Sequence, residues 1–175
     1  MGSVSCTFIE NGFESRLKTG AVFLDLTAAY DTVWHKGLLL KLSKTIPAWA
    51  TASIKTLLTN RRFRVHLGQN KSAWRTQKNG LPQGSVLAPT LFNLYTDDLP
   101  TTKSRKFIYA DDICLAFQAP DFDPLERVLQ EDLAKLDMFC KTWRLKPSPA
   151  KTVSSVFHLH NAKAGIELNI ELSGA

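Results

Sequence analysis

The sequence has few cysteines and no long apolar run, and both absences narrow the kinds of protein it can be. Its three cysteines, Cys6, Cys114 and Cys140, lack the spacing of a disulfide framework or a zinc site, which favours a reducing compartment. No stretch approaches the roughly 20 apolar residues of a membrane span, and the N-terminus lacks the apolar core of a secretory signal. We therefore expect an intracellular protein with no membrane partner.

Acidic residues are missing from one part of this basic chain. The formal net charge is +6 over 175 residues, yet no Asp or Glu lies between Lys55 and Lys78. The basic residues there include Arg61, Arg62, Arg64, Lys71, Arg75 and Lys78, interleaved with Phe63 and Trp74. Such a stretch can neutralise phosphates while its rings pack against sugar or base, so we regard these basic residues as candidates for nucleic-acid binding. A solvated hairpin whose aromatic rings face the core would have the same composition.

The most informative segment is the tetrad Tyr109-Ala110-Asp111-Asp112. It lies between Lys106-Phe107-Ile108 and the apolar run 113–117, which predicts two short strands joined by a tight acidic turn. Each carboxylate makes its neighbour harder to ionise, and a divalent cation, with magnesium the natural candidate, would relieve that cost. The alternative is a solvated turn in which both carboxylates face water.

Asp25 adds a third carboxylate at the end of another expected strand. It follows the apolar segment 20–24, which is typical of a buried strand. Phosphoryl-transfer enzymes hold two metal ions about 3.5–4 Å apart with carboxylates from more than one strand, and Asp25, Asp111 and Asp112 supply such a set. Alternatively, Asp25 ends its strand and caps the helix that follows.

Three blocks of sequence resemble the palm of a reverse transcriptase, in particular that of non-LTR, LINE-like and jockey-type retrotransposons. They are Phe-Leu-Asp-Leu-Thr-Ala-Ala-Tyr-Asp-Thr-Val-Trp-His (23–35), Asn-Gly-Leu-Pro-Gln-Gly-Ser-Val-Leu-Ala-Pro-Thr-Leu-Phe-Asn (79–93) and Tyr-Ala-Asp-Asp (109–112), in the family's order and spacing. The resemblance implies an α+β palm-like fold, in which an antiparallel sheet carries the catalytic carboxylates and packs on helices. It also implies one partial domain over residues 1–175, a palm with part of the fingers but without the N-terminal finger motifs and the C-terminal thumb.

Carried over residue by residue, the resemblance makes Asp25 and Asp111 metal ligands, with Asp112 beside them. It implies two Mg²⁺ ions, for which Mn²⁺ can substitute. Tyr30 matches the family's steric gate, an aromatic ring that occupies the space a ribose 2′-hydroxyl would need. A core tyrosine on the inner face of a short helix is the alternative for Tyr30.

The other matching positions concern the nucleotide and the leaving group. Gln83, with Gly84 next to it, matches the residue that contacts the incoming nucleotide, although the same loop would serve as an ordinary turn before a helix over 86–97. Lys151 matches a lysine that assists the departure of pyrophosphate, by donating a proton or as a nearby positive charge. Ser148 stands where the family usually has Asn, a better turn residue, which puts the geometry at Lys151 in question. Without the match, Lys151 is an ordinary surface lysine.

A second Tyr-x-Asp-Asp motif occurs at Tyr95-Thr96-Asp97-Asp98. It follows Leu91-Phe92-Asn93-Leu94 at helical spacing and runs into Leu99-Pro100, which predicts the end of a helix. We therefore assign catalysis to residues 109–112, and a structural role to Asp98.

Further along the chain, the apolar stripe of residues 125–143 predicts a long helix over 124–143. Asp123 is expected to cap it, with Pro124 in the first helical position and Glu126 completing a capping box. Strands are expected around 152–159 and 166–172.

The reaction implied by the resemblance is RNA-templated DNA synthesis by a two-metal mechanism. Its partners would be an RNA template, a DNA primer and deoxynucleoside triphosphates, in the nucleus and cytoplasm, and the fragment alone would be weak or inactive. One alternative is a non-catalytic nucleic-acid-binding remnant or adopted module that uses the basic stretch. Another is a palm-like nucleotide cyclase, although a cyclase has no evident need for the matches at Tyr30 and Gln83.

Overall fold

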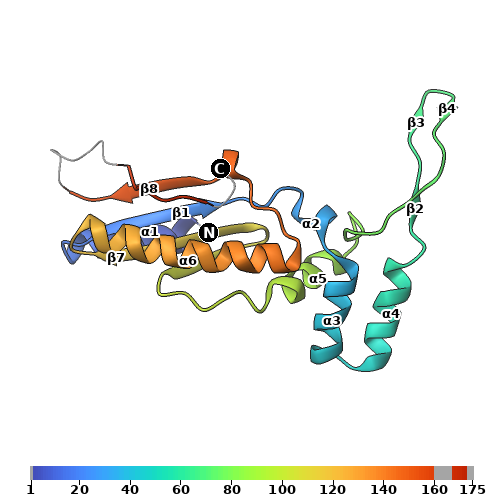
Figure 1. The fold of residues 1–175 in the computed structure, drawn as a ribbon, viewed down its shortest axis with the longest axis horizontal. Coiled ribbons are helices and arrows are strands. Elements are labelled where there is room, and N and C mark those ends of the chain that lie inside the picture. The colour runs from blue at the N-terminus through green and yellow to red at the C-terminus, as the bar shows by residue number, and fades with distance from the viewer. Residues whose placement is uncertain (1, 160–166, 173–175) are drawn as a thin grey trace. The chain divides into compact units, whose positions relative to one another are not determined.

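The computed structural model describes residues 2–159 and 167–172 (Figure 1). The chain divides into two compact units, one formed by residues 1–27 together with 99–175 and the other by residues 28–98.

The first unit is built around a four-stranded antiparallel sheet with the strand order β6-β7-β1-β8. The strands are β1 (Lys18–Leu24), β6 (Arg105–Tyr109), β7 (Asp112–Ala119) and β8 (Val153–Phe157). The helices of this unit are α1 (Gly2–Glu14) and α6 (Phe122–Trp143), with the short 3₁₀ turn η1 (Pro149–Lys151) before β8. The two central strands are apolar runs because both of their faces are covered.

Helix α6 covers one face of this sheet, as its apolar stripe predicts. The core on this side combines alternate strand residues with helix residues spaced by three and four positions. It includes Val22, Leu24, Ile113, Leu115, Leu125, Leu129, Leu133 and Leu136, all at most 5% exposed. Each such side chain contributes about 1.5–3 kcal/mol on burial, so this layer forms the foundation of the first unit.

A smaller core lies on the opposite face of the sheet. Ala21, Phe107, Cys114 and Ala116 are buried there, and Phe8 of α1 packs against them. The Phe8 and Phe107 rings meet edge to face with centroids 5.8 Å apart. Helix α1 therefore covers part of the face that α6 leaves open.

The N-terminus of α6 differs from the prediction. The helix begins at Phe122, so the N-cap residue is Asp121 and not the predicted Asp123. The side chain of Asp121 makes no capping hydrogen bond. Phe122 itself packs partly buried against the core. The prediction was wrong because burial of this ring extends the helix past the position that the local capping pattern favoured. Glu126 does not complete a capping box either, since its Oε1 accepts a bond from the distant backbone N–H of Asn169.

Residues 167–172 do not form the predicted strand, and residue 166 lies outside the described residues. The segment runs along α6 instead. Glu126 Oε1 accepts from Asn169 N at 3.0 Å, and Gln130 Oε1 accepts from Glu171 N at 2.8 Å. Side chains of the helix thus take the place of a neighbouring strand, while the two leucines of the segment are buried in the core.

Asp132 of α6 is a fully buried acid that ties the helix to the start of β6. Its Oδ2 accepts bonds from Ser104 N at 2.7 Å and Ser104 Oγ at 2.8 Å, and Lys135 Nζ lies 2.8 Å from its Oδ1. Burial raises the pKa of Asp132, but the bonds from Lys135 and Ser104 outweigh burial and hold the pKa below its usual value.

The second unit contains four helices and a hairpin arm. The helices are α2 (Ala29–Thr32), α3 (His35–Thr45), α4 (Ala48–Leu58) and α5 (Leu87–Thr96). Helix α5 lies within the range 86–97 that the sequence predicted. The arm consists of β2 (Arg62–Phe63), β3 (His66–Leu67), β4 (Asn70–Lys71) and β5 (Arg75–Thr76), and projects from the helices (Figure 1). None of the helices in the described part of the chain is long and apolar enough to span a membrane.

Candidate active site

The tetrad 109–112 forms the tip of a hairpin, which confirms the predicted strand-turn-strand. Tyr109, the last residue of β6, pairs with Asp112, the first residue of β7, so Ala110 and Asp111 alone make the turn. Ala110 has a φ of 54°, in the left-handed region that tight two-residue turns require. Asp111 is half-buried and Asp112 is exposed at this tip.

Asp25 lies beside this tip because of the register between β1 and β7. Leu24 pairs with Ile113 in this antiparallel pair, so Asp25, one residue later, lies alongside Asp112, one residue earlier. Its side chain is 26% exposed, and its Oδ2 atom is buried without a hydrogen-bond partner. The Lys151 Nζ atom lies 3.1 Å from this oxygen, close enough for an ion pair although the pair lacks hydrogen-bond geometry. The carboxylate therefore has charge compensation but no directional bond on that oxygen.

The segment that carries Lys151 is attached to the end of β1 by backbone bonds. Ser148 N donates to Asp25 O at 2.8 Å, and Thr27 N donates to Lys146 O at 2.8 Å. Ser148 O accepts from Lys151 N at 3.1 Å, which closes the turn η1. Ser148 makes this turn through its main chain and not through its side chain. The turn that places Lys151 near Asp25 thus forms with serine at this position.

The three carboxylates were expected to form one metal site, and the structure shows only part of that arrangement. It places Asp25 alongside Asp112, with Asp111 in the adjoining turn. Among the described residues, however, no group of three or more His, Cys, Asp or Glu side chains is assembled to hold a metal ion. The residues nonetheless suit a divalent cation. Carboxylate oxygens are the donors that Mg²⁺ prefers, and Asp25 Oδ2 is a buried acceptor with no hydrogen bond.

The second unit contains the residues expected to contact the nucleotide. The ring of Tyr30 is half-buried and stacks on Phe92, with centroids 4.7 Å apart and planes inclined by 20°. Leu81 N donates to Tyr30 O at 2.8 Å and so fixes the loop 79–85 to α2. Gln83 is exposed in this loop, and Gly84 next to it has a φ of 79°. Tyr30 and Gln83 therefore belong to one hydrogen-bonded substructure.

Two residues of this substructure were not foreseen. Asp31 accepts two bonds from Gln83 Nε2, at 2.9 Å to Oδ1 and 3.0 Å to Oδ2, so the amide nitrogen faces Asp31. His35 Nε2 donates to Gly80 O at 2.7 Å. Both lie in or beside the first matching block, but nothing local signals a partner about fifty positions along the chain.

The other Tyr-x-Asp-Asp motif lies where the sequence predicted it, at the end of a helix. Tyr95 is fully buried within α5, and Asp97 is its C-cap residue. Asp98 forms an ion pair with Lys41, whose Nζ also donates to Tyr95 O at 2.6 Å. Burial lowers the pKa of Lys41 although the Asp98 carboxylate opposes that shift. These contacts join the end of α5 to α3.

Comparison with known proteins shows the family to which the chain belongs. The family model described as reverse transcriptase (RNA-dependent DNA polymerase) matches residues 3–164. The chain belongs to the reverse transcriptase family. The resemblance seen in the three sequence blocks is thereby confirmed.

Two curated relatives of this reverse transcriptase chain come from Drosophila melanogaster. A probable RNA-directed DNA polymerase from transposon BS is 38% identical over 175 residues, which cover 95% of this chain and 19% of the relative. The RNA-directed DNA polymerase from mobile element jockey is 29% identical, over 93% of this chain and 19% of the relative. The chain thus spans about a fifth of the length of these polymerases.

A solved structure supports the palm-like α+β fold. An apo telomerase from Candida tropicalis, truncated from its C-terminal domain, superimposes with a TM-score of 0.61 at 12% identity. The match covers 90% of this chain and 35% of the telomerase chain. At this identity the likeness concerns the fold of the reverse transcriptase chain alone.

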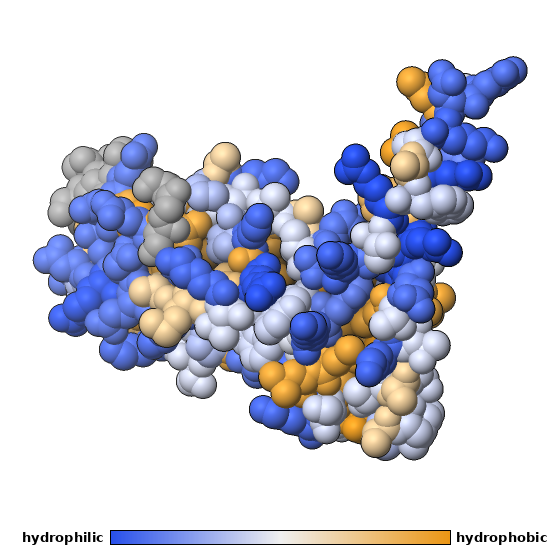
Figure 2. All heavy atoms as spheres, turned by 45° about the vertical axis from the view of Figure 1, so that its right-hand side comes forward, coloured by the Kyte–Doolittle hydropathy of each residue, from blue (hydrophilic) through white to orange (hydrophobic). Residues whose placement is uncertain are grey.

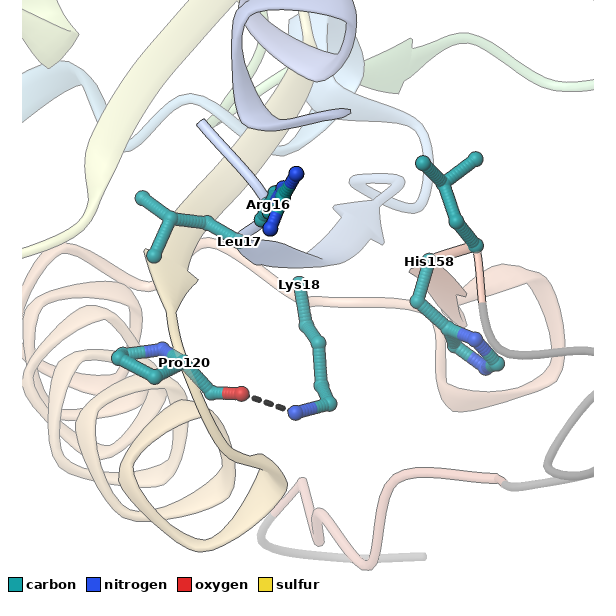
Figure 3. Close-up of a pocket in the computed structure, with 6 residues that line it drawn as sticks. Arg16, Leu17, Lys18, Pro120 and His158 are labelled. Atoms are coloured by element: carbon teal, nitrogen blue, oxygen red, sulfur yellow. Dashed lines mark hydrogen bonds between the residues drawn. The ribbon is translucent and has the colours of Figure 1, made fainter. Parts of the chain in front are cut away.

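One cavity in the first unit of this reverse transcriptase chain lies away from Asp25. It has a volume of about 400 Å³ and is lined by Arg16, Leu17, Lys18, Pro120, His158 and Leu159 (Figure 3). Lys18 begins β1, whereas Asp25 follows the other end of that strand. The Lys18 ammonium group is bound by the Pro120 carbonyl group and lies 3.2 Å from Asp121 Oδ1. This basic group is therefore committed to the protein itself.

Proposed function

We propose that this chain is the palm portion of a retrotransposon reverse transcriptase and carries out RNA-templated addition of deoxynucleotides to a DNA primer. The observation that carries the proposal is the position of Asp25. A buried carboxylate oxygen without a hydrogen bond lies at a strand end, in register with the acidic tip of the neighbouring hairpin. The family membership supports the same reaction.

In this proposal Asp25 and Asp111 would hold the divalent ions, with Asp112 as the adjacent acid. When bound, two magnesium ions, or manganese ions in their place, activate the primer hydroxyl and neutralise charge on the triphosphate. The contribution of the protein is to hold its carboxylates in place. The pairing of β1 with β7 and the two-residue turn at 110–111 do this without long flexible side chains.

Lys151 has two roles in this proposal. Without a bound cation its ammonium group, 3.1 Å from Asp25 Oδ2, compensates the carboxylate. During the reaction it would move toward the leaving pyrophosphate and donate a proton or stabilise negative charge. Its side chain is 70% exposed, so no packing prevents that movement.

Tyr30 and Gln83 would select the incoming nucleotide. Stacking on Phe92 fixes the ring of Tyr30, so an added 2′-hydroxyl would meet a surface that cannot easily yield. Gln83 has its amide nitrogen committed to Asp31, which leaves its carbonyl oxygen available to accept a bond from the nucleotide. Deoxynucleotides are therefore the expected substrates.

The decisive experiment is primer extension on poly(rA) annealed to oligo(dT), in Mg²⁺ or Mn²⁺. Asp111→Asn should lower incorporation at least about a hundredfold, since it removes a charged ligand of the reacting centre. Asp97→Asn is the matched control, because it makes the same change in the helical Tyr-x-Asp-Asp and should leave incorporation unchanged. Equal loss in both variants would contradict our assignment of the tetrad.

The same experiment tests a second function. The exposed basic arm favours nucleic-acid binding without polymerisation, because it carries no acidic residue and contains Trp74 at 57% exposure. If the folded chain and a version extended at both ends bind nucleic acid but incorporate no nucleotide, and Asp111→Asn leaves that binding intact, the chain is a binding module and not a polymerase.

A further inference from the structure

The arm is one continuous hairpin with an extra residue on its returning strand. Phe63 pairs with Arg75 near its base, and His66 pairs with Lys71 farther out. Between these pairs the first strand advances from 63 to 66 and the second goes back from 75 to 71, so the second strand uses one more residue. This two-against-one arrangement is a β-bulge, which twists a hairpin and redirects its side chains. Ala73 and Trp74 together lie opposite Arg64.

The bulge sorts the side chains of the arm onto two different faces. Because side chains alternate along a strand, Arg62, Arg64 and His66 share one face. Pairing adds Lys71, opposite His66, and the ring of Trp74 lies against the same arginines. We call these five residues the cationic face. Without the bulge, Lys71 and Trp74 would not both fall on this side.

The other face of the arm is apolar. Phe63, Val65 and Leu67 follow one another at alternate positions and are 48%, 62% and 79% exposed. Arg75, the partner of Phe63, belongs to this side. Figure 2 shows the arm as mostly hydrophilic, with isolated hydrophobic patches. Positive charge is therefore concentrated on one side of the hairpin.

Two arginines of the cationic face are held in place by the arm itself. The guanidinium carbon of Arg64 lies 4.6 Å from the centroid of the Trp74 ring, and that of Arg62 lies 5.9 Å from it. Arg64 Nε also donates to His66 Nε2 at 3.0 Å. Neither contact uses the terminal N–H groups of Arg64, which form the planar fork that binds a phosphate in two places.

We infer that the cationic face is a binding site for the phosphodiester backbone of a nucleic acid, with Trp74 acting as a platform that orders Arg62 and Arg64. The inference rests on the proposed function only in that the nucleic acid bound would be the template or the template–primer hybrid. Ordered arginines lose less side-chain freedom on binding than free ones, and no Asp or Glu between 55 and 78 competes with the phosphates. Arg61 and Arg75, candidates by composition, are assigned no phosphate contact; Arg61 Nη1 instead donates to Gly80 O at 3.2 Å.

Fluorescence anisotropy of the whole chain with labelled oligonucleotides over a range of salt concentrations tests this site. The probes are single-stranded RNA, single-stranded DNA and an RNA–DNA duplex, and the tightest binder identifies which nucleic acid the arm holds. Arg62→Gln, Arg64→Gln and Lys71→Gln should each lower the slope of log affinity against log salt by about 1, because each removes one phosphate contact. Arg75→Gln removes the same charge from the apolar face and should leave the slope unchanged.

The role of Trp74 is tested by a double-mutant cycle. Trp74→Leu removes no charge, yet it should weaken binding about threefold or more because it releases both arginines. When Trp74→Leu is combined with Arg64→Gln, its effect should be smaller than it is alone, since only Arg62 is then left for the ring to order. Circular dichroism of each variant verifies that the arm and helices remain folded.

The possible outcomes separate this inference from the proposed polymerase function. Equal slopes for Arg64→Gln and Arg75→Gln would overturn it, as would additive effects of Trp74→Leu and Arg64→Gln or the absence of binding to all three probes. None of these measurements requires nucleotide incorporation. A chain that fails primer extension but shows the expected difference between faces would support the site without support for polymerisation by this chain alone.

Discussion

Gly80 is the position at which a single methyl group should do most damage to the loop that carries Gln83. Its φ is 86°, and a Cβ atom built on it would lie 2.7 Å from the carbonyl oxygen of Asp31 and 3.0 Å from its carbonyl carbon and Cα. All three are backbone atoms. The Asp31 backbone cannot yield easily, because its N–H donates to Ala28 O at 2.9 Å within the first turn of α2.

Gly84 provides the reference for the magnitude. Its φ is 79°, close to that of Gly80, but no atom lies within 4 Å of the Cβ it would gain. Gly84→Ala should therefore lower the free energy of unfolding by about 1–2 kcal/mol, the cost of a left-handed conformation for an L-residue. Gly80→Ala has that cost and an overpacking cost of about 1–3 kcal/mol in addition, for a total of about 2–5 kcal/mol.

Urea denaturation followed by circular dichroism measures both variants. We expect the midpoint to fall clearly more for Gly80→Ala than for Gly84→Ala, with Gly68→Ala as a third case, since Gly68 also has a positive φ of 57° and open space at its Cβ. If all three alanine variants lose the same stability, the backbone conformation alone explains the cost. The close approach of Gly80 to Asp31 would then not constrain the loop.

Two further predictions concern the first unit. Asp132→Asn should lower the free energy of unfolding by about 1–3 kcal/mol at neutral pH, because an amide cannot accept all the bonds that the carboxylate receives, including those from Ser104. The folded pKa of Asp132 lies below its unfolded value, so its contribution to the free energy of unfolding is present above about pH 4 and is lost as the pH falls through the folded pKa. The variant should therefore lose less stability in acid than the parent chain does, which urea titration at several pH values measures. Burial raises the pKa of Cys114 to about 11 and that of Cys140 to about 12. Iodoacetamide at pH 8 should therefore modify only the exposed Cys6 in the folded chain, as detected by mass spectrometry. Rapid modification of all three cysteines would contradict the packing of the two buried thiols.

The elements that the sequence predicts well are those whose signal is local and repeated. The apolar stripe of α6 specifies a helix because each turn repeats the same face, and the flanks of 109–112 specify a hairpin because two apolar strands leave only a short acidic connection. The register of β1 against β7 then brings Asp25 to Asp112, so the neighbourhood of two of the three expected carboxylates follows from the strands themselves.

The features that the sequence does not predict depend on partners far along the chain. Nothing near residue 169 indicates that Glu126 will accept its backbone N–H, and so a segment of strand-like composition packs along a helix. The bond between Gln83 and Asp31 joins residues 52 positions apart. The bulge opposite Arg64 depends on a difference of one residue between two strand pairings, which composition does not reveal.

The ion pair between Lys151 and Asp25 has a practical consequence for anyone who purifies this chain. A negative charge confined at a strand end would normally make local folding depend on the salts in the buffer. Here the ammonium group, 3.1 Å away, supplies an internal counter-ion from the same polypeptide. Protein prepared in a strong chelator should therefore keep its sheet intact, and an added divalent cation would have to displace a tethered amine before it could reach the carboxylate.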